Sequence, residues 1–125
     1  MTGAGDLVRR VAFDARDVLD DGFGNGVETW QQRLVCRAGF TFLRGGESVI
    51  AARLEGRQPI VVRVRASSST RQIGADWRMR DLRAGAWAAD AGGAYWAGPV
   101  YAVRSVIPSP DRQWLDIMVE SGVAA

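Results

Sequence analysis

Apolar and polar residues alternate along much of the chain, and the clearest alternation lies near the C-terminus. Within Trp114–Glu120 every second residue is apolar, namely Leu115, Ile117 and Val119. The preceding segment, Val100–Ile107, is rich in β-branched and aromatic residues, which favour strands. Between the two lies Pro108–Arg112, where Pro110 suits the first corner of a turn and Asp111 the second. The pattern predicts a β-hairpin and indicates an antiparallel β protein.

Four segments upstream also have strand-like patterns: Leu7–Ala15, Val27–Phe42, Gln58–Ala66 and Asp76–Arg83. In the second of them the predicted core face holds Trp30, Leu34, Cys36, Ala38 and Phe40. In the third the predicted core face holds Ile60, Val62 and Val64. Gly39 interrupts the longest segment, and a lone glycine inside a strand often marks a β-bulge. We therefore expect at least six strands, with a bulge at Gly39.

Three segments break the strand pattern. Glu47–Glu55 has the spacing of a short helix, in which Ile50 and Leu54 would face the core together. Asp17–Gly26 is polar and glycine-rich and predicts a loop. Residues 84–97 have a period of neither 2 nor 3.6 and predict a long loop. The fold class expected is mainly β, a small antiparallel barrel or sandwich with one short helix and a long loop.

Length and composition agree with one compact unit. A chain of 125 residues, of which 47% are hydrophobic, suits a single domain spanning 1–125. No apolar run approaches the roughly 18 residues of a membrane span, and no signal peptide is expected from the N-terminal residues. Cys36 is the single cysteine, so no internal disulfide can form, which fits a reducing compartment.

The residue types argue against most catalytic sites. The chain has no histidine, which removes the usual general base, metal ligand and triad partner. Cys36 lies on a predicted apolar face and has no histidine to activate it, so a buried inert thiol is expected. A carboxylate-based hydrolase would need Asp76 or Asp81 to converge with Asp116 in a pocket. We expect no enzyme activity, no cofactor and no metal.

One stretch partly imitates a calcium loop. Counted from Asp17, acids stand at the first, fifth and twelfth places and a glycine at the sixth, but Leu19 occupies the place of the third ligand. Strands rather than helices are expected on both sides. The glycines of residues 22–26 are followed by no lysine and open no helix, so they do not form a phosphate loop. A polar turn is the favoured interpretation.

Charge is distributed unevenly. Residues 1–28 carry three arginines and six acids, residues 29–83 carry eleven arginines and four acids, and there is no lysine. Arg63 and Arg65 alternate along one predicted strand, as do Arg78 and Arg80 along another. If these strands lie side by side, they form one basic patch that would face DNA or a neighbouring subunit. A solvated sheet face is the alternative.

The order of several segments carries a family resemblance. These segments are Gly5-Asp6-Leu7 before a strand, an acidic glycine-bearing loop before Glu28-Thr29-Trp30, Gly45-Gly46-Glu47, the VVRVR of residues 61–65, and the closing unit of residues 98–121. Together they resemble the head–tail joining proteins of tailed phages, also called head closure or stopper proteins, and the versions in gene transfer agents. Residues 84–97 are longer than the connection expected there.

The resemblance implies a structural role in a virion or phage-like particle assembled in the bacterial cytoplasm. Copies of such a protein form a sixfold or twelvefold ring below the portal and adaptor, seal the channel that holds packaged DNA, and dock a tail terminator or tail tube protein. The residues expected to contact partners lie in two predicted loops: Asp20, Asp21, Phe23 and Asn25 in the first, and Trp87, Tyr95 and Trp96 in the second. No membrane is involved.

The main alternative is a free nucleic-acid-binding domain with an OB-like barrel. Such a domain needs aromatic residues on the same sheet face as its arginines. Trp77 and Met79 alternate with Arg78 and Arg80 and therefore lie on the opposite face. This pattern favours the structural interpretation.

Overall fold

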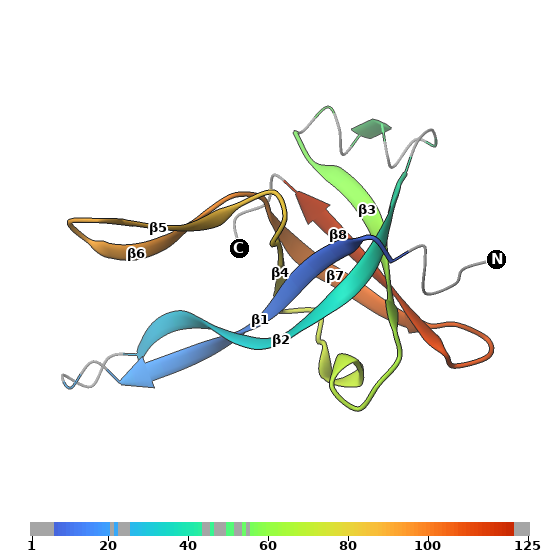
Figure 1. Cartoon of the computed structure of the whole chain (residues 1–125), viewed down its shortest axis with the longest axis horizontal. Helices are drawn as coiled ribbons and strands as arrows, with labels where there is room; N and C mark the ends of the chain where they lie inside the picture. Colours follow the sequence, from blue (N-terminus) through green and yellow to red (C-terminus); the bar gives the residue numbers. More distant parts are fainter. Residues whose placement is uncertain are drawn as a thin grey trace.

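The computed structural model describes residues 7–20, 22, 26–43, 46, 50–51, 54 and 56–121, without the side chains of 18–20 and 26–28. Six strands close a barrel in the order β1-β2-β3-β8-β7-β4, and every neighbouring pair in it is antiparallel (Figure 1). The strands of the barrel are β1 (Arg9–Asp20), β2 (Gly26–Phe42), β3 (Gln58–Arg65), β4 (Arg78–Asp81), β7 (Val100–Pro108) and β8 (Trp114–Ser121). A separate hairpin consists of β5 (Ala86–Asp90) and β6 (Gly93–Ala97).

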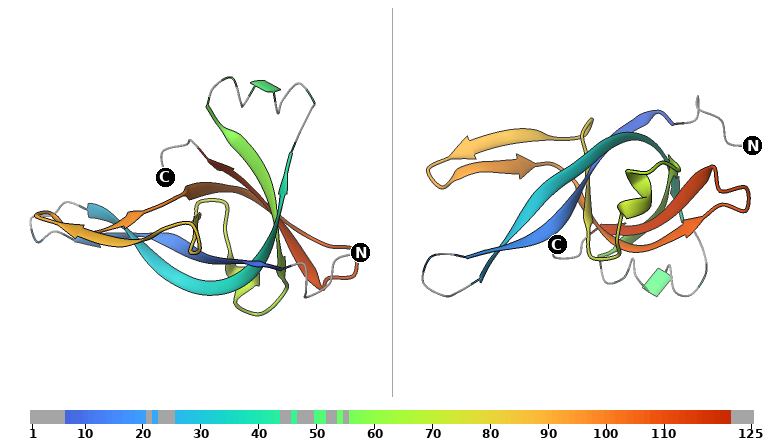
Figure 2. Two further views of the ribbon diagram at one scale, coloured as in Figure 1. Left: turned by 45° about the horizontal axis from the view of Figure 1, so that its top comes forward. Right: turned by 90° about the horizontal axis from the view of Figure 1, so that it is seen from below.

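The core lies inside the barrel and follows the alternation of the sequence. Its buried members are Val11, Phe13, Ala38, Ile60, Val62, Val64, Ile73, Met79, Val103, Leu115, Ile117 and Val119. The short 3-10 helix η2 (Thr70–Gln72) lies at one end of the barrel (Figure 2) and is followed by the buried Ile73. Removal of these apolar side chains from water is the main stabilising contribution to such a fold.

The C-terminal hairpin is as predicted. β7 and β8 pair antiparallel, and Leu115, Ile117 and Val119 all point into the core. The turn between them closes with a hydrogen bond from the Arg112 amide to the Ser109 carbonyl, which makes Pro110 and Asp111 its two corners. The alternation within β3 is also confirmed.

Two hairpins project beyond the barrel on the same side of it (Figures 1 and 2). The first, here called the β1–β2 arm, consists of residues 15–20 and 26–32, because β1 runs further than the predicted strand and pairs with β2 as far as Asp20↔Gly26. The second, the β5–β6 arm, spans residues 86–97. Residues 84–97 were predicted as a long loop, and that prediction is wrong. Alanine and glycine occur on both faces of β5 and β6, and this hides the alternation.

The predicted bulge lies elsewhere. Gly39 pairs with Arg63 in regular register, whereas the β1–β2 register shifts where Phe13 pairs with Leu34 and Asp14 with Gln32. Arg33 is therefore the extra residue of β2. Because an extra residue reverses which face the following side chains occupy, Trp30 lies with Asp14 on the outer face and not with Leu34 on the core face.

The predicted helix falls largely outside the described residues. Of Glu47–Glu55, the structure describes Ile50, Ala51 and Leu54, which are helical. Ile50 is 51% exposed and Leu54 is 84% exposed. The expectation that they face the core is wrong, since the strands of the closed barrel fill its interior. Among the described residues no helix is long and apolar enough to span a membrane.

Candidate functional site

A buried ionic cluster joins the outer face of the barrel to the β5–β6 arm. Asp14 of β1 accepts hydrogen bonds from Arg78 Nε at 2.7 Å, Arg80 Nε at 2.8 Å and Arg80 Nη2 at 2.9 Å. Arg80 Nη2 also donates to Gln32 Oε1 at 2.7 Å. Asp14 and Arg80 are each 1% exposed. Buried charges are tolerated only when paired in this way, so the cluster fixes β1, β2 and β4 relative to one another.

Two tryptophans of the arm enclose the Arg80 guanidinium. Its central carbon lies 4.9 Å from the ring centroid of Trp87 and 5.0 Å from that of Trp96. The two indoles meet edge to face at 5.7 Å. Arg80 Nη1 is buried without a hydrogen-bond acceptor. The faces of the indoles therefore provide its favourable contacts, through cation–π attraction.

A third tryptophan extends the cluster along the outer face. Arg78 lies 4.8 Å from the ring centroid of Trp30, and Arg16 lies 4.8 Å from the same centroid. The bulge at Arg33 makes this possible, because it places Trp30 on the same face as Asp14. The aromatic rings next to these arginines thus come from other strands, which alternation within one strand could not reveal.

The β5–β6 arm leaves the barrel through a narrow neck formed by two glycines. A Cβ added to Gly85 would lie 2.7 Å from the Ala97 carbonyl oxygen and 2.7 Å from the Gly98 Cα. Trp96 packs on the same neck, and its Nε1 donates to the Pro99 carbonyl at 3.2 Å. Only glycine allows the two chains to approach so closely, and the base of the arm is therefore held in one orientation.

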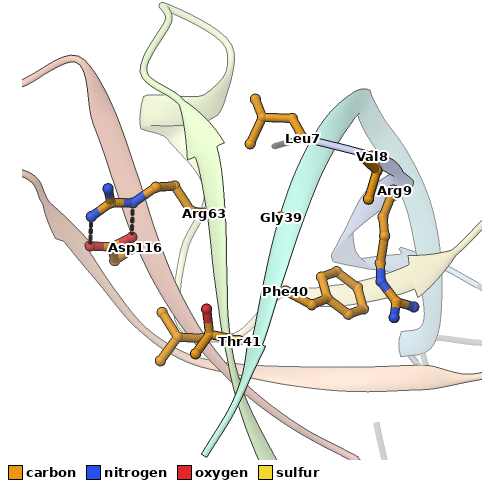
Figure 3. Close-up of a pocket in the computed structure, with 9 residues that line it drawn as sticks. Leu7, Val8, Arg9, Gly39, Phe40, Thr41, Arg63 and Asp116 are labelled. Atoms are coloured by element: carbon orange, nitrogen blue, oxygen red, sulfur yellow. Dashed lines mark hydrogen bonds and ion pairs between the residues drawn. The ribbon is translucent and has the colours of Figure 1, made fainter. Parts of the chain in front are cut away.

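A shallow groove lies on another part of the barrel (Figure 3). On one side of it Arg63 donates from Nε and Nη2 to the two oxygens of Asp116, both at 2.7 Å. This hydrogen bonding raises the Arg63 pKa above its usual value. On the other side Arg9 lies 4.4 Å from the Phe40 ring centroid and donates to Asp81 at 3.2 Å. Leu7, Val8, Gly39, Thr41 and Val61 complete the lining.

The predicted basic patch does not form. In the barrel, β8 and β7 separate β3 from β4 on one side, and β1 and β2 separate them on the other. Arg63 and Arg65 therefore lie apart from Arg78 and Arg80. Arg80 is buried, while Arg65 is exposed and lies 5.3 Å from the Trp114 ring centroid. The premise that the two strands are neighbours was wrong, because alternation within a strand says nothing about which strands pair.

The other predicted contact residues fall on the two arms. Trp87 is 58% exposed and Tyr95 is 47% exposed, whereas Trp96 is half-buried at the neck. Asp20 ends β1, and its side chain is not described. Asp21, Phe23 and Asn25 lie outside the described residues. The role of these residues in partner contacts stays a prediction.

Three of the carboxylates that were considered for chemistry are held in ion pairs. Asp81 pairs with Arg9, Asp116 pairs with Arg63, and Asp17 pairs with Arg33. No group of three or more potential metal ligands occurs in the described part of the chain. Burial raises the pKa of the Cys36 thiol to about 11, so it is protonated at neutral pH. These arrangements suit a structural role.

Comparison with known proteins agrees with the fold. Residues 3–122 match the sequence profile of a family described as phage head completion protein. A Shigella flexneri 2a protein of known solution structure is similar, with a TM-score of 0.66 and 19% identity over 99% of this chain and 100% of that one. A chain from the virion of a native gene transfer agent particle has a TM-score of 0.59 and 19% identity over 95% and 97%. No match was found among curated proteins. Since the profile covers nearly the whole sequence, the chain belongs to the phage head completion protein family.

Proposed function

We propose that this chain is a structural head–tail connector subunit of a tailed phage or gene transfer agent particle. In this role copies form a ring between the portal or adaptor and the tail, close the channel that holds the packaged DNA, and give the tail its docking surface. The observation that carries the proposal is the family match over residues 3–122. The similarity to a chain of a gene transfer agent virion supports the fold that such a subunit would have.

The shape of the subunit supports a role in contacts between proteins. Both arms project from a barrel whose core needs neither of them, since the described core side chains all lie within the closed barrel and η2 region. An isolated two-stranded hairpin is only marginally stable in water. We therefore assign the arms to contacts with other components of the particle, with exposed Trp87 and Tyr95 as anchors of the β5–β6 arm.

A knockout with complementation tests the proposal. In a strain that produces the particle, loss of this chain is expected to give heads in electron micrographs that lack tails and have lost packaged DNA, and the wild-type chain is expected to restore filled, tailed particles. Mass spectrometry of purified particles should detect the chain in a fixed ratio to the portal protein. Tailed, infectious particles that lack the chain would contradict the proposal.

Point variants test the assignment of the arm. W87A/Y95A removes two exposed rings. The barrel should stay folded, because Trp96 still covers Arg80 and Asp14 still pairs with it. The yield of tailed particles should fall about tenfold or more, the range expected for hot-spot residues. Ile107→Ala is the matched control, because Ile107 is an exposed apolar residue of the barrel itself. Equal yields from both variants would remove the β5–β6 arm from the contact surface.

A free nucleic-acid-binding domain is less well supported. Such a domain needs exposed rings on which bases can stack. Trp30 and Trp96 already hold the guanidinium groups of Arg16, Arg78 and Arg80. Titration of the isolated chain with oligonucleotides separates the two functions, since a steeply salt-dependent complex at micromolar concentration is expected only for the nucleic-acid binder.

A further inference from the structure

Three exposed arginines lie in a row across the outer face of the barrel. Arg10 of β1 is directly opposite Arg37 of β2. The β2–β3 pairing ends where Gly39 pairs with Arg63, and Arg37 and Arg65 are each two residues beyond that pair, on the same face as Arg63. Arg37 and Arg65 also line the same shallow hollow, together with Ser67 and Thr70. Arg10, Arg37 and Arg65 are here called the arginine row.

In the part of the chain that the structure describes, the arginine row has no acidic partner. Among the described residues no carboxylate lies within ion-pair distance of any of its three guanidinium groups, whereas Arg9, Arg63 and Arg80 all have one. Like charges directly opposite each other on neighbouring strands destabilise a sheet. Three such residues in succession therefore indicate a surface whose charge is neutralised by an anionic partner in the assembled state.

The chain itself carries a segment of matching charge that cannot reach this surface in the same molecule. In the sequence, residues 17–28 hold four acids and no basic residue, and one of these acids, Asp17, pairs with Arg33. Arg10 and Asp20 belong to one continuous strand and are ten residues apart. At about 3.3 Å per residue an extended strand keeps them roughly 30 Å apart. Any contact between the acidic arm and the arginine row must therefore join two molecules.

We propose that the arginine row binds the acidic β1–β2 arm of a second copy of this chain, an inference that rests on the connector function proposed above. The contact joins different surfaces of the two molecules, so it can repeat from subunit to subunit and close a ring. The row is about 10 Å wide, two strand spacings, which is close to the width of one hairpin.

Two variants isolate this contact in solution. D20R/D21R changes the net charge of residues 17–28 from −4 to zero and keeps the row, and R10E/R37E/R65E reverses the charge of the row and keeps the arm. When mixed, they can form one native contact only, so a dimer results and no ring. Nuclear magnetic resonance suits a 13.6 kDa chain and detects millimolar affinity. We would titrate ¹⁵N-labelled D20R/D21R with unlabelled R10E/R37E/R65E.

The expected result is saturable shifts of the labelled Arg10, Arg37 and Arg65 amides, which disappear at 1 M salt. The matched control is D90R/R10E/R37E/R65E as titrant, which alters the β5–β6 arm and should shift the same amides. A titrant that carries D20R/D21R in addition to R10E/R37E/R65E should shift none of these amides. Dispersed spectra verify that each variant folds, and R10Q/R37Q/R65Q replaces the triple reversal if that variant does not fold.

Absence of shifts at about 1 mM titrant, or shifts confined to other surfaces, would overturn the inference. Shifts of the same amides on addition of a DNA duplex, with none on addition of the arm-bearing titrant, would assign the row to DNA instead and would also overturn it. The proposed connector function has a separate readout, the presence of the chain in purified particles. A chain found in particles without the amide shifts would refute this contact alone.

Discussion

At the scale of single residues, Asp14 has the largest structural consequence. Its carboxylate compensates the buried charge of Arg80 and binds Arg78 as well, and these arginines in turn contact tryptophans of both arms. The sequence identified Asp14 only as a polar position in a strand. Its partners come from a strand more than 60 residues away, and residue patterns within one segment cannot reveal such a pair.

Replacing this carboxylate should be costly. Asp14→Asn removes the negative charge beside two arginines, one of them fully buried, and should lower the free energy of unfolding by about 3–5 kcal/mol. Asp17→Asn is the matched control, because Asp17 forms an exposed pair with Arg33 worth less than about 1 kcal/mol. Urea denaturation followed by tryptophan fluorescence measures both. Losses of the same size would show that the buried pair has no special weight.

At the scale of elements, the alternation of apolar residues predicted strands well wherever one face is buried. β3 and β8 follow it closely, because side chains inside a closed barrel must be apolar while the outer ones meet water. It failed for β5 and β6, whose exposed faces carry mostly alanine and glycine. It also misplaced Trp30, because the extra residue at Arg33 has no signature in composition. The strand order separates β3 from β4, so the predicted basic patch does not form. This order depends on pairing between segments that are distant in the sequence, which alternation within one segment does not report.

The neck of the β5–β6 arm gives a prediction at this scale. Gly85→Ala adds a methyl group 2.7 Å from backbone atoms of residues 97 and 98, which must move. Overpacking of this kind costs about 1–3 kcal/mol, and it should be confined to the arm. Hydrogen exchange should show loss of protection in residues 86–97 and unchanged protection in β3 and β8.

Gly92→Ala serves as the control for the neck. Its added Cβ would lie 3.3 Å from one oxygen of the Asp90 side chain, which can move aside. Exchange in the arm should remain as in the wild-type chain. Faster exchange throughout the barrel of Gly85→Ala would mean that the arm and the barrel unfold as one unit, contrary to this prediction.

At the scale of the whole molecule, the barrel provides stability and the arms provide surfaces for contacts. The closed barrel carries the apolar core. Among the described residues of β1 and β2, Phe13 and Leu34 are the core side chains nearest to the β1–β2 arm. Closure pairs both sides of each barrel strand, which removes the unpaired edges that promote aggregation. The arms can therefore be devoted to contacts without loss of the fold.

Shortening the β1–β2 arm tests this division. Asn-Gly in place of residues 17–29 joins Arg16 to Trp30, which lie directly opposite each other, through a two-residue turn. The shortened chain should unfold within a few degrees of the wild-type midpoint by circular dichroism, because no core residue is lost. It should not restore tails in the knockout strain. A large drop in the midpoint, or full complementation, would refute the division.

Because Arg33 is an extra residue with no residue of β1 opposite it in the register, it is the one position in the described strands of the β1–β2 hairpin that can be lost without a change of register. Deletion of Arg33 would bring Gln32 next to Leu34 and restore even pairing, with Asp14 still opposite Gln32 and Arg16 still opposite Trp30. Trp30 and Gln32 would therefore stay on the face of Arg78 and Arg80. Loss of this one codon would thus remove a local kink and leave every other amino acid of the arm on its present face.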